Sequence, residues 1–382
     1  MTNFELRMRK MLFVFLCICT MMNSCRKDEE ILPPEIIHVT SPENYQGLIG
    51  FYLLNEGNMG SNKSTLDYMD LTTGNYHRNI YGYANPTVPK ELGDVGNDLQ
   101  IYGGRLYAVL NCSNKIEIMD KFTAKRIGQI NIPNCRYIKF CEGYAYITSY
   151  AGPVEINPNY EQIGYVAKVD TATLQVVERC LVGFQPEELE IVGEKIYVAN
   201  SGGYRMPNYE NTVSVIDIQS FTETNRIEVA NNLHRLRADR HVNLWVSSRS
   251  YAGGSSNLYW IDTQTDTYGG VFPFAVSQMT LDGDLLYQFS ASSTDWTDNI
   301  GILDVTKKEM VTNNFISDGE EKKITKPYGL MVNPINKDVY LTDAGNYFLP
   351  GSLYCFDKDG KKKWQVLTGD IPAHFALLYK HK

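Results

Sequence analysis

The side chains with the most evident chemistry lie in long polar connections between apolar segments. Eight of them are aromatic, at Tyr150, Tyr160, Tyr204, Tyr209, Tyr251, Trp296, Tyr347 and Phe348. Polar groups accompany them at Asn58, Arg205, Asn208, Arg249 and Asp298. Flat rings beside amide, guanidinium and carboxyl groups suit the binding of a large, flat ligand with polar edges. The alternative is that some of these rings only pack one connection against another.

A second set of polar side chains begins equivalent apolar segments in a repeated pattern. Its seven members are Asn97, Arg136, Glu187, His234, Gln278, Tyr328 and His374. We expect them to surround the mouth of a channel and to contact a ligand there; the alternative is a solvated rim. Imidazoles can ligate transition metals, but His234 and His374 lie three repeats apart, so we predict no metal site.

The elements that must position these residues repeat along the chain. An apolar segment that ends in small polar residues, such as "KIYVANSGG" at 195–203, occurs seven times. A second segment follows each copy and ends at an aspartate, at Asp70, Asp120, Asp170, Asp217, Asp262, Asp304 and Asp357, with steps of 42–53 residues. Because Asx side chains hydrogen-bond the backbone of their own turn, we interpret these aspartates as turn residues and not as catalytic groups.

Two further strands complete each repeat, an outer one such as "TNRIEVA" and an inner one such as "PEELEIVGE". Four-stranded units of about 40–50 residues indicate a β-propeller. The first unit lacks its inner strand, whereas "AHFALLY" at 373–379 has no unit of its own. We therefore predict an all-β fold, a seven-bladed β-propeller with four-stranded blades. In this fold the C-terminal strand closes the first blade and removes an open sheet edge.

This strand order places the connections on two faces. The short aspartate turns lie on one face, which we call the turn face. The connections from second to third strand, and from outer strand to the next inner strand, lie on the other, which we call the long-loop face; the stretch 81–96 belongs to it. Because long loops on a rigid scaffold usually carry binding function, we predict that the ligand-binding residues share the long-loop face.

The N-terminal residues resemble a lipoprotein export signal. The apolar run "MLFVFLCICT" follows Arg7, Arg9 and Lys10 and is shorter than the about 20 residues that span a bilayer. Cys25 resembles the lipidated cysteine of a bacterial lipobox, and "RKDEE" after it resembles the acidic tag that sends Bacteroidota lipoproteins to the outer face of the outer membrane. We predict a signal peptide at 1–24, a lipidated flexible tether at 25–44 and a propeller at 45–382. The alternative is an ordinary signal peptide with an incidental cysteine.

The cadence "YVANSG…VSVIDI…I.V" at 195–229 resembles the YncE-like seven-bladed propellers. Together with the lipobox and the acidic tag, the chain resembles surface propeller lipoproteins of Bacteroidota, among them the BtuG-type proteins that bind vitamin B12. The resemblance implies capture of a corrinoid on the long-loop face and delivery to a TonB-dependent transporter in the outer membrane. It implies no cofactor apart from cobalamin as a bound ligand.

Other functions stay open at this point. They are a glycan-binding lipoprotein, a protein-interaction scaffold, and a lactonase-type or quinoprotein-type propeller enzyme whose site is assembled from several blades. The sequence contains no HExxH spacing, GxSxG elbow or phosphate loop, so we do not expect an enzyme. A net charge of −8 without a basic cluster argues against nucleic acid as a partner.

Overall fold

A computed structural model describes residues 33–43, 45–89, 91–249, 256–290 and 300–381 of the protein. Tyr251, Trp296, Asp298 and the predicted lipidation site Cys25 lie outside the described residues. The chain divides into two units, Met1–Pro33 and Pro34–Lys382, and the description below concerns the second.

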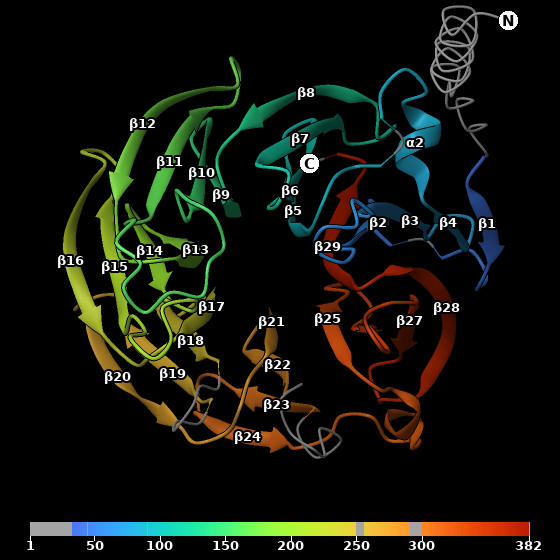
Figure 1. Cartoon of the computed structure of the whole chain (residues 1–382). Coiled ribbons are helices and arrows are strands. Elements are labelled where there is room, and N and C mark those ends of the chain that lie inside the picture. Colours follow the sequence, from blue (N-terminus) through green and yellow to red (C-terminus); the bar gives the residue numbers. More distant parts are fainter. Residues whose placement is uncertain (1–32, 44, 90, 250–255, 291–299, 382) are drawn as a thin grey trace, which may run out of the picture. The chain divides into compact units, whose positions relative to one another are not determined.

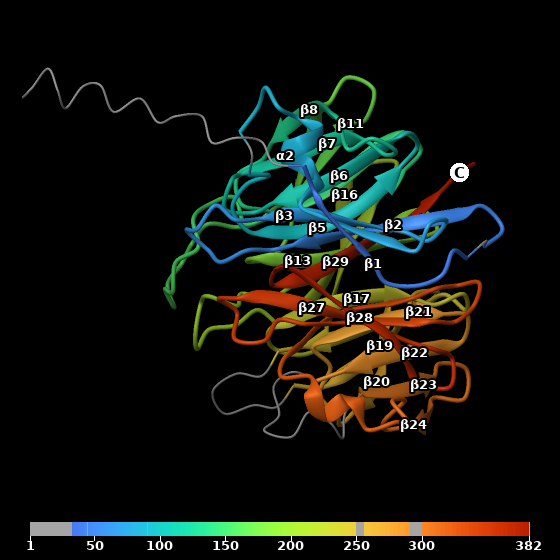
Figure 2. The same ribbon diagram turned by 90° about the vertical axis from the view of Figure 1, so that its right-hand side faces the viewer.

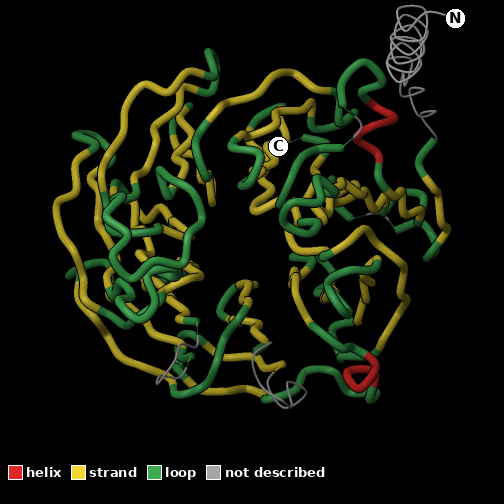
Figure 3. Tube along the Cα trace, in the orientation of Figure 1, coloured by secondary structure: helices red, strands yellow, loops and turns green. Residues whose placement is uncertain are grey.

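The second unit is a ring of seven antiparallel sheets, which confirms the predicted seven-bladed β-propeller (Figures 1 and 3). The inner strands are β5 (Gly96–Tyr102), β9 (Cys135–Cys141), β13 (Pro186–Val192), β17 (Leu233–Ala238), β21 (Gln278–Asp282), β25 (Pro327–Val332) and β29 (Pro372–Tyr379). The second strands are β2 (Leu48–Asn55), β6 (Arg105–Leu110), β10 (Tyr144–Ser149), β14 (Lys195–Asn200), β18 (Asn243–Ser248), β22 (Leu285–Phe289) and β26 (Val339–Asp343).

The third and outer strands complete the blades. The third strands are β3 (Thr65–Asp70), β7 (Lys115–Asp120), β11 (Tyr165–Asp170), β15 (Thr212–Asp217), β19 (Leu258–Asp262), β23 (Ile300–Asp304) and β27 (Pro350–Phe356). The outer strands are β4 (Asn75–Arg78), β8 (Arg126–Asn131), β12 (Gln175–Leu181), β16 (Thr222–Glu228), β20 (Thr267–Phe272), β24 (Glu309–Thr312) and β28 (Lys362–Asp370). Figure 2 views the ring from the side, with long connections and short turns at opposite ends of the strands.

The C-terminal strand closes the ring as predicted. β29 pairs with β2 of blade one, from Leu48↔Tyr379 to Asn55↔Pro372. It also contacts the inner strands of both neighbouring blades, β5 and β25. The first blade therefore joins the two ends of the propeller, and β29 gives it the inner strand that the other blades have.

The apolar core lies between blades. The described residues form seven clusters of buried apolar side chains, one for each pair of neighbouring blades. In one cluster, Tyr52 and Leu54 of blade one pack with Leu99 and Leu106 of blade two. The second strands are covered on both sides, which explains why their sequences are rich in Val, Ile, Leu and Tyr. Since apolar burial is the main favourable contribution to folding, each blade is stabilised by both neighbours.

The seven repeated aspartates cap their own turns, as predicted. At Asp120, Oδ1 accepts the backbone N–H groups of Phe122 at 3.1 Å and Thr123 at 3.0 Å. The same kind of bond occurs at Asp70, Asp170, Asp217, Asp262, Asp304 and Asp357. Backbone hydrogen bonds lower the pKa of Asp170 and Asp217 because they favour the charged carboxylate.

The predicted flexible tether is partly ordered. Glu35–His38 forms β1, which pairs with β4 from Glu35↔Arg78 to His38↔Asn75 and makes blade one five-stranded. An ion pair of 2.6 Å between Arg78 Nη1 and Glu35 Oε2 supports this pairing. The flexible-tether prediction therefore does not hold for these residues. The outer edge of a sheet offers N–H and C=O groups that recruit a further strand, and four residues are too few to reveal a strand by periodicity.

In the ranges that the structure describes, the loops contain two short helices, α2 (Ile80–Ala84) and the 3-10 helix η2 (Glu320–Lys323). α2 begins the long connection 81–96, and its Tyr81 is buried in the core between blades one and two. In the described part of the chain, no helix has both the length and the apolar character needed to cross a bilayer.

Candidate functional site

Five of the predicted residues meet around one carboxylate at the channel mouth. Glu187 of β13 is fully buried and accepts hydrogen bonds from Arg136 Nη2 at 2.9 Å and Arg249 Nη1 at 2.8 Å. The Tyr150 hydroxyl also donates to Glu187, and its ring centre lies 4.8 Å from the Arg136 guanidinium. Asn97 Nδ2 donates to the Arg136 carbonyl oxygen at 2.7 Å. We call these residues the Glu187 cluster.

The cluster carries a permanent negative charge at its centre. Burial by itself would raise the pKa of Glu187, but the charges of Arg136 and Arg249 outweigh burial and lower the pKa to about 2. Burial holds the pKa of Tyr150 well above its usual value, so its hydroxyl keeps the proton that it donates. Tyr150 is fully buried, and it therefore supports the cluster instead of presenting its ring on the surface.

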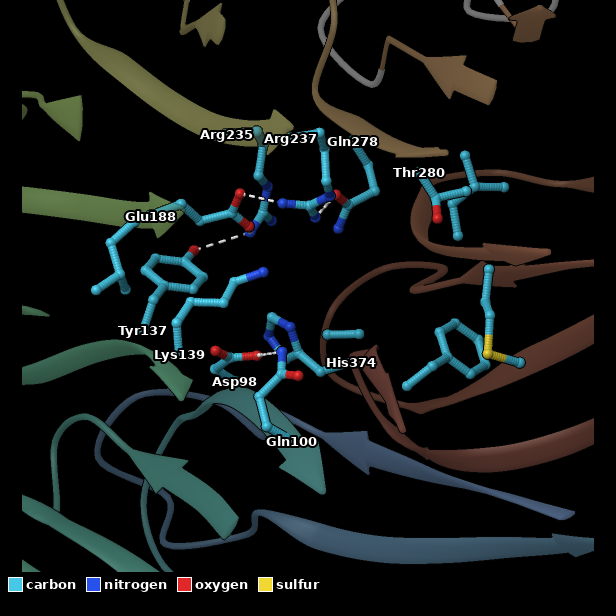
Figure 4. A pocket seen from close by; sticks show the side chains of 15 residues that line it. Asp98, Gln100, Tyr137, Lys139, Glu188, Arg235, Arg237, Gln278, Thr280 and His374 are labelled. Carbon is cyan, nitrogen blue, oxygen red and sulfur yellow. Dashed lines mark hydrogen bonds and ion pairs between the residues drawn. The ribbon is translucent and has the colours of Figure 1, made fainter. Parts of the chain in front are cut away.

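A cavity of about 210 Å³ lies in the channel, lined by the residues that follow the mouth residues on their strands (Figure 4). Glu188, the neighbour of Glu187 on β13, binds Arg235 at 2.9 Å and also binds Arg237. These two arginines overcome the effect of burial and lower the pKa of Glu188 to about 2. Figure 4 shows both arginines on one side of the cavity beside Gln278, with Lys139 projecting toward its middle.

His234 is buried near the arginines that bind the two carboxylates, and it is neutral. Burial lowers its pKa well below the usual value, and the nearby charges of Arg235 and Arg249 lower it further. The Tyr137 hydroxyl accepts from Arg235 Nη1 at 2.9 Å and lies 3.3 Å from His234 Nε2. Because that hydroxyl has one hydrogen to give, it donates to an unprotonated Nε2. His234 thus extends the polar network.

Another carboxylate, that of Glu56, joins blades one and seven. Glu56 accepts the Tyr328 hydroxyl at 2.8 Å and lies 3.1 Å from His374 Nε2. The Tyr328 ring meets the Tyr347 ring edge-on, with centroids 5.9 Å apart. Asn58 Nδ2 donates to the Tyr347 carbonyl oxygen at 2.5 Å. Glu56, which the sequence interpretation missed, therefore contacts two of the predicted residues, Tyr328 and His374. Tyr347 and Asn58 join them through the Tyr328 ring.

The seven inner-strand residues are not at equivalent positions. Gln278 and His374 line the channel cavity with Glu188, one place further along the strand than Glu187. β13 contains a register shift between Pro186 and Leu189, whereas β21 pairs regularly from Gln278 onward. The equal ring predicted from the sequence is therefore wrong at these two residues. β29 has a register shift between Pro372 and His374, like the shift in β13 after Pro186, so His374 corresponds to Glu188 and not to Glu187. Sequence spacing does not reveal where such a β-bulge falls.

A larger hollow of about 640 Å³ opens on the long-loop face between the loops of blades one, two and three. Its residues come from second-to-third and outer-to-inner connections, as predicted for a binding face. They combine apolar surface with side-chain amides and one thiol: Met59, Pro133, Gly152, Pro153 and Val154, with Asn111, Asn114, Asn134 and Cys112. None of these residues was predicted from the sequence, although Met59 follows the predicted Asn58.

Several other predicted loop residues hold neighbouring loops together. Arg205 lies 3.7 Å from the centre of the Phe184 ring and donates from Nε to the Tyr160 carbonyl oxygen at 3.1 Å. Tyr204 meets Tyr150 edge-on at 6.2 Å. These contacts agree with the alternative that some rings pack one loop against another.

Phe348 differs from these residues, since 74% of its surface is exposed. Asn208 binds the Pro158 carbonyl oxygen, and Tyr209 is half-buried.

The sequence contained a signal for the missed channel residues. Polar side chains occupy alternate positions of the inner strands in "GNDLQ", "CRYIK", "PEELE" and "LHRLR", which supply Asp98, Lys139, Glu188, Arg235 and Arg237. A strand with a packed blade on both sides has no reason to alternate in this way unless one set of positions faces a polar channel. Within the described ranges, no group of three or more His, Cys, Asp or Glu side chains is placed to hold a metal ion.

Fold and site define a seven-bladed propeller with a charged channel and an open hollow on its long-loop face. The chain belongs to the family described as Domain of unknown function (DUF5074), which matches residues 49–371. No curated protein matches the sequence.

Solved structures with a similar fold include the following two. One is a quinonprotein alcohol dehydrogenase-like protein from Bacteroides thetaiotaomicron, with 15% identity, a TM-score of 0.56 and coverage of 87% of this chain and 79% of that one. Another is hydrazine synthase from Kuenenia stuttgartiensis, with 16% identity, a TM-score of 0.55 and coverage of 69% and 77%. At these identities the likeness is one of fold alone, and the YncE-like and BtuG-type resemblance stays a prediction.

Proposed function

We propose that this protein is a lipid-anchored binding protein of the outer-membrane surface. It captures a corrinoid on the long-loop face and passes it to a TonB-dependent transporter. The observation that carries the proposal is the open hollow of about 640 Å³ among the long loops of blades one to three. A lipid on Cys25 would hold the propeller at the membrane.

The size of the two spaces favours the face over the channel. Pockets for drug-sized ligands measure about 300–1,000 Å³. The hollow of about 640 Å³ falls in this range, whereas the channel cavity of about 210 Å³ falls below it. A corrinoid would therefore lie on the long-loop face and not enter the channel.

The chemistry of the hollow suits a flat macrocycle with amide edges. Met59, Pro133 and Val154 offer apolar surface for a ring, while the exposed Asn114 offers a side-chain amide for its edge. Exposed apolar side chains recur in the loops of this face, where Met59 is 71% and Phe348 74% exposed. Exposed apolar surface of this kind commonly marks a binding site. The corrinoid is chosen among large flat ligands because of the sequence resemblance.

The walls of the hollow are already fixed by internal hydrogen bonds. Asn134 donates from Nδ2 to the Gly152 carbonyl oxygen at 2.8 Å, and its backbone N–H binds Asn114 Oδ1 at 2.7 Å. Asn111 Nδ2 binds the Cys135 carbonyl oxygen at 3.1 Å. A preorganised site loses little conformational entropy on binding, which favours affinity.

Calorimetry with cyanocobalamin tests the proposal, with soluble glycans as competing ligands. We expect binding at micromolar concentration or tighter, and Met59→Ala should weaken it about fivefold, as for a contact residue worth about 1 kcal/mol. Leu181→Ala is the matched control, because Leu181 is an equally accessible aliphatic side chain on the outer strand β12. No cobalamin binding, or glycan binding in its place, would reject the corrinoid.

The anchoring part of the proposal has its own test. Cys25→Ala should release the protein from membranes, because the lipid could no longer be attached. Replacement of residues 27–30 by alanine should protect the protein from protease added to intact cells. If protease on intact cells never reaches the wild-type protein, it is not displayed at the surface.

A further inference from the structure

We propose that the channel cavity beside Glu188 binds a small oxyanion, a phosphate or a carboxylate group. This second site does not depend on the proposed capture of a corrinoid, because its residues line the channel and not the hollow on the long-loop face. The inference rests on the hydrogen-bonding state, the charge and the size of the cavity.

The carboxylates of the cavity are saturated by the protein. Glu188 Oε1 accepts from Arg235, and Oε2 accepts from Arg237 and from the backbone N–H of Leu236. Across the cavity, Asp98 accepts the backbone N–H groups of Leu99 at 2.8 Å and Ile138 at 3.0 Å, and also the Gln100 amide. These carboxylates have little capacity left for a donor on a ligand.

The donors of the cavity, by contrast, are only partly used. Among the described residues, Arg235 Nη2 and Gln278 Nε2 have no acceptor, and Arg237 Nη2 has one at 3.5 Å, the Gln278 side-chain oxygen. Lys139 Nζ binds Glu190 at 2.9 Å and has two further hydrogens to donate. These groups converge on one space (Figure 4). A ligand that satisfies them must bring acceptors.

Charge points to the same class of ligand. Around the adjacent carboxylates Glu187 and Glu188 lie four guanidinium groups, those of Arg136, Arg249, Arg235 and Arg237, which leaves two positive charges in excess. His234 among them is neutral. An uncompensated buried charge is costly, and arginine binds carboxylate and phosphate oxygens in a forked geometry. An oxyanion would offset the excess.

Charges on the opposite side of the channel restrict where the anion can lie. Lys139 is balanced by Glu190, while Asp98 of blade two and Glu56 of blade one are acidic. The channel is therefore positive beside blades four and five and negative beside blades one and two. We assign the oxyanion to the space between Arg235, Arg237 and Gln278.

The cavity volume limits the size of the ligand. About 210 Å³ is several times the roughly 30 Å³ that a water molecule occupies in the liquid. It is less than the about 300 Å³ at which pockets for drug-sized ligands begin. Inorganic phosphate and short carboxylates fit this range.

Titration calorimetry and thermal unfolding of the purified protein test the inference. The probes are sodium phosphate and sodium acetate, each compared with sodium chloride at equal ionic strength. We expect saturable binding and a raised melting temperature with one oxyanion or both, and the two arms tell phosphate from carboxylate. Arg237→Gln should weaken binding about tenfold or more, because a charged hydrogen bond is lost.

Arg226→Gln is the matched control, since it removes the same charge from the outer strand β16, where Arg226 pairs with Glu223. It should bind as the wild type does. Gln278→Leu removes a donor without changing the charge and should weaken binding as well, which keeps the test valid if Arg237→Gln does not fold. The inference is overturned if neither anion binds saturably, or if both channel variants bind like Arg226→Gln.

Discussion

The two faces of the propeller hold their connections in different ways. On the turn face, Asp120 binds backbone N–H groups two and three residues ahead of it. On the long-loop face, Glu187 binds Arg136, 51 residues away, and Arg249, 62 residues away. The turn face therefore repeats one local solution in every blade, whereas the long-loop face is built once, from pairs that only the closed ring brings together. Binding sites belong to the second kind of construction.

Loss of Glu187 should produce the largest effect. Glu187→Ala leaves Arg136 and Arg249 without the carboxylate that both contact, in a site where Glu187 is fully buried. Removal of one partner from a buried ion pair costs about 3–5 kcal/mol. The free energy of unfolding in urea, measured for wild type and variant, checks this value. A loss as small as that of a turn variant would mean that the long-range pairs do not stabilise the face.

Acid should lower the free energy of unfolding through the buried ionisable groups of the channel. His234 has a pKa well below the ordinary 6.5, so only the unfolded chain gains its proton as the pH falls below 6.5, and stability decreases. Glu187 and Glu188 have pKa values of about 2 against an ordinary 4.5. Their contribution is complete above pH 4.5 and is lost as the pH falls toward 2.

Urea unfolding from about pH 7.5 to about pH 4 should therefore show a decline that begins near 6.5. In His234→Gln the decline between about pH 6.5 and pH 4.5 should be smaller than in the wild type, and the part that remains includes the contribution of His77, whose pKa burial also lowers. His77→Gln is the control, because the pKa of His77 on β4 is lowered by burial in the same direction but to a lesser extent. A pH profile unchanged by His234→Gln would contradict the assignment of a neutral His234.

A single turn aspartate should matter much less. Asp120→Ala removes the acceptor for the backbone N–H groups of Phe122 and Thr123. Loss of a comparable side-chain cap costs about 1 kcal/mol. Urea unfolding should show this small decrease and no change in ligand binding, since the turn lies on the opposite face. A decrease as large as that of Glu187→Ala would remove the distinction between the faces.

The smallest effect on stability is expected at Phe348. Its side chain is 74% exposed on the long-loop face, so Phe348→Ala should change the free energy of unfolding by no more than about 0.5 kcal/mol. Phe122→Ala, on the turn face and 50% exposed, is the matched control for the loss of an exposed ring. Only Phe348→Ala should weaken cobalamin binding in calorimetry; equal effects from both variants would show that the long-loop face has no special part.

The number of blades, the order of their strands and the role of the seven aspartates could be predicted from the amino-acid sequence. Each of these predictions depends on interactions that are short along the chain. They are the alternation of side chains along a strand and the aspartate carboxylate that accepts backbone N–H groups two or three residues ahead. The closure by β29 could also be predicted, because an inner strand without a blade must pair with the blade that lacks one.

The side chains that form the sites could not be predicted in the same way, because the folded ring brings them together. Glu56 and Glu188 contact residues of other blades, Gln278 and His374 line the channel cavity with Glu188 and not the mouth with Glu187, and β1 joins blade one. The hollow is made by loops of three blades, with none of its residues marked by a motif. The physical reason is that side chains distant in the chain interact only after the ring closes, and no spacing along the sequence records which of them will meet.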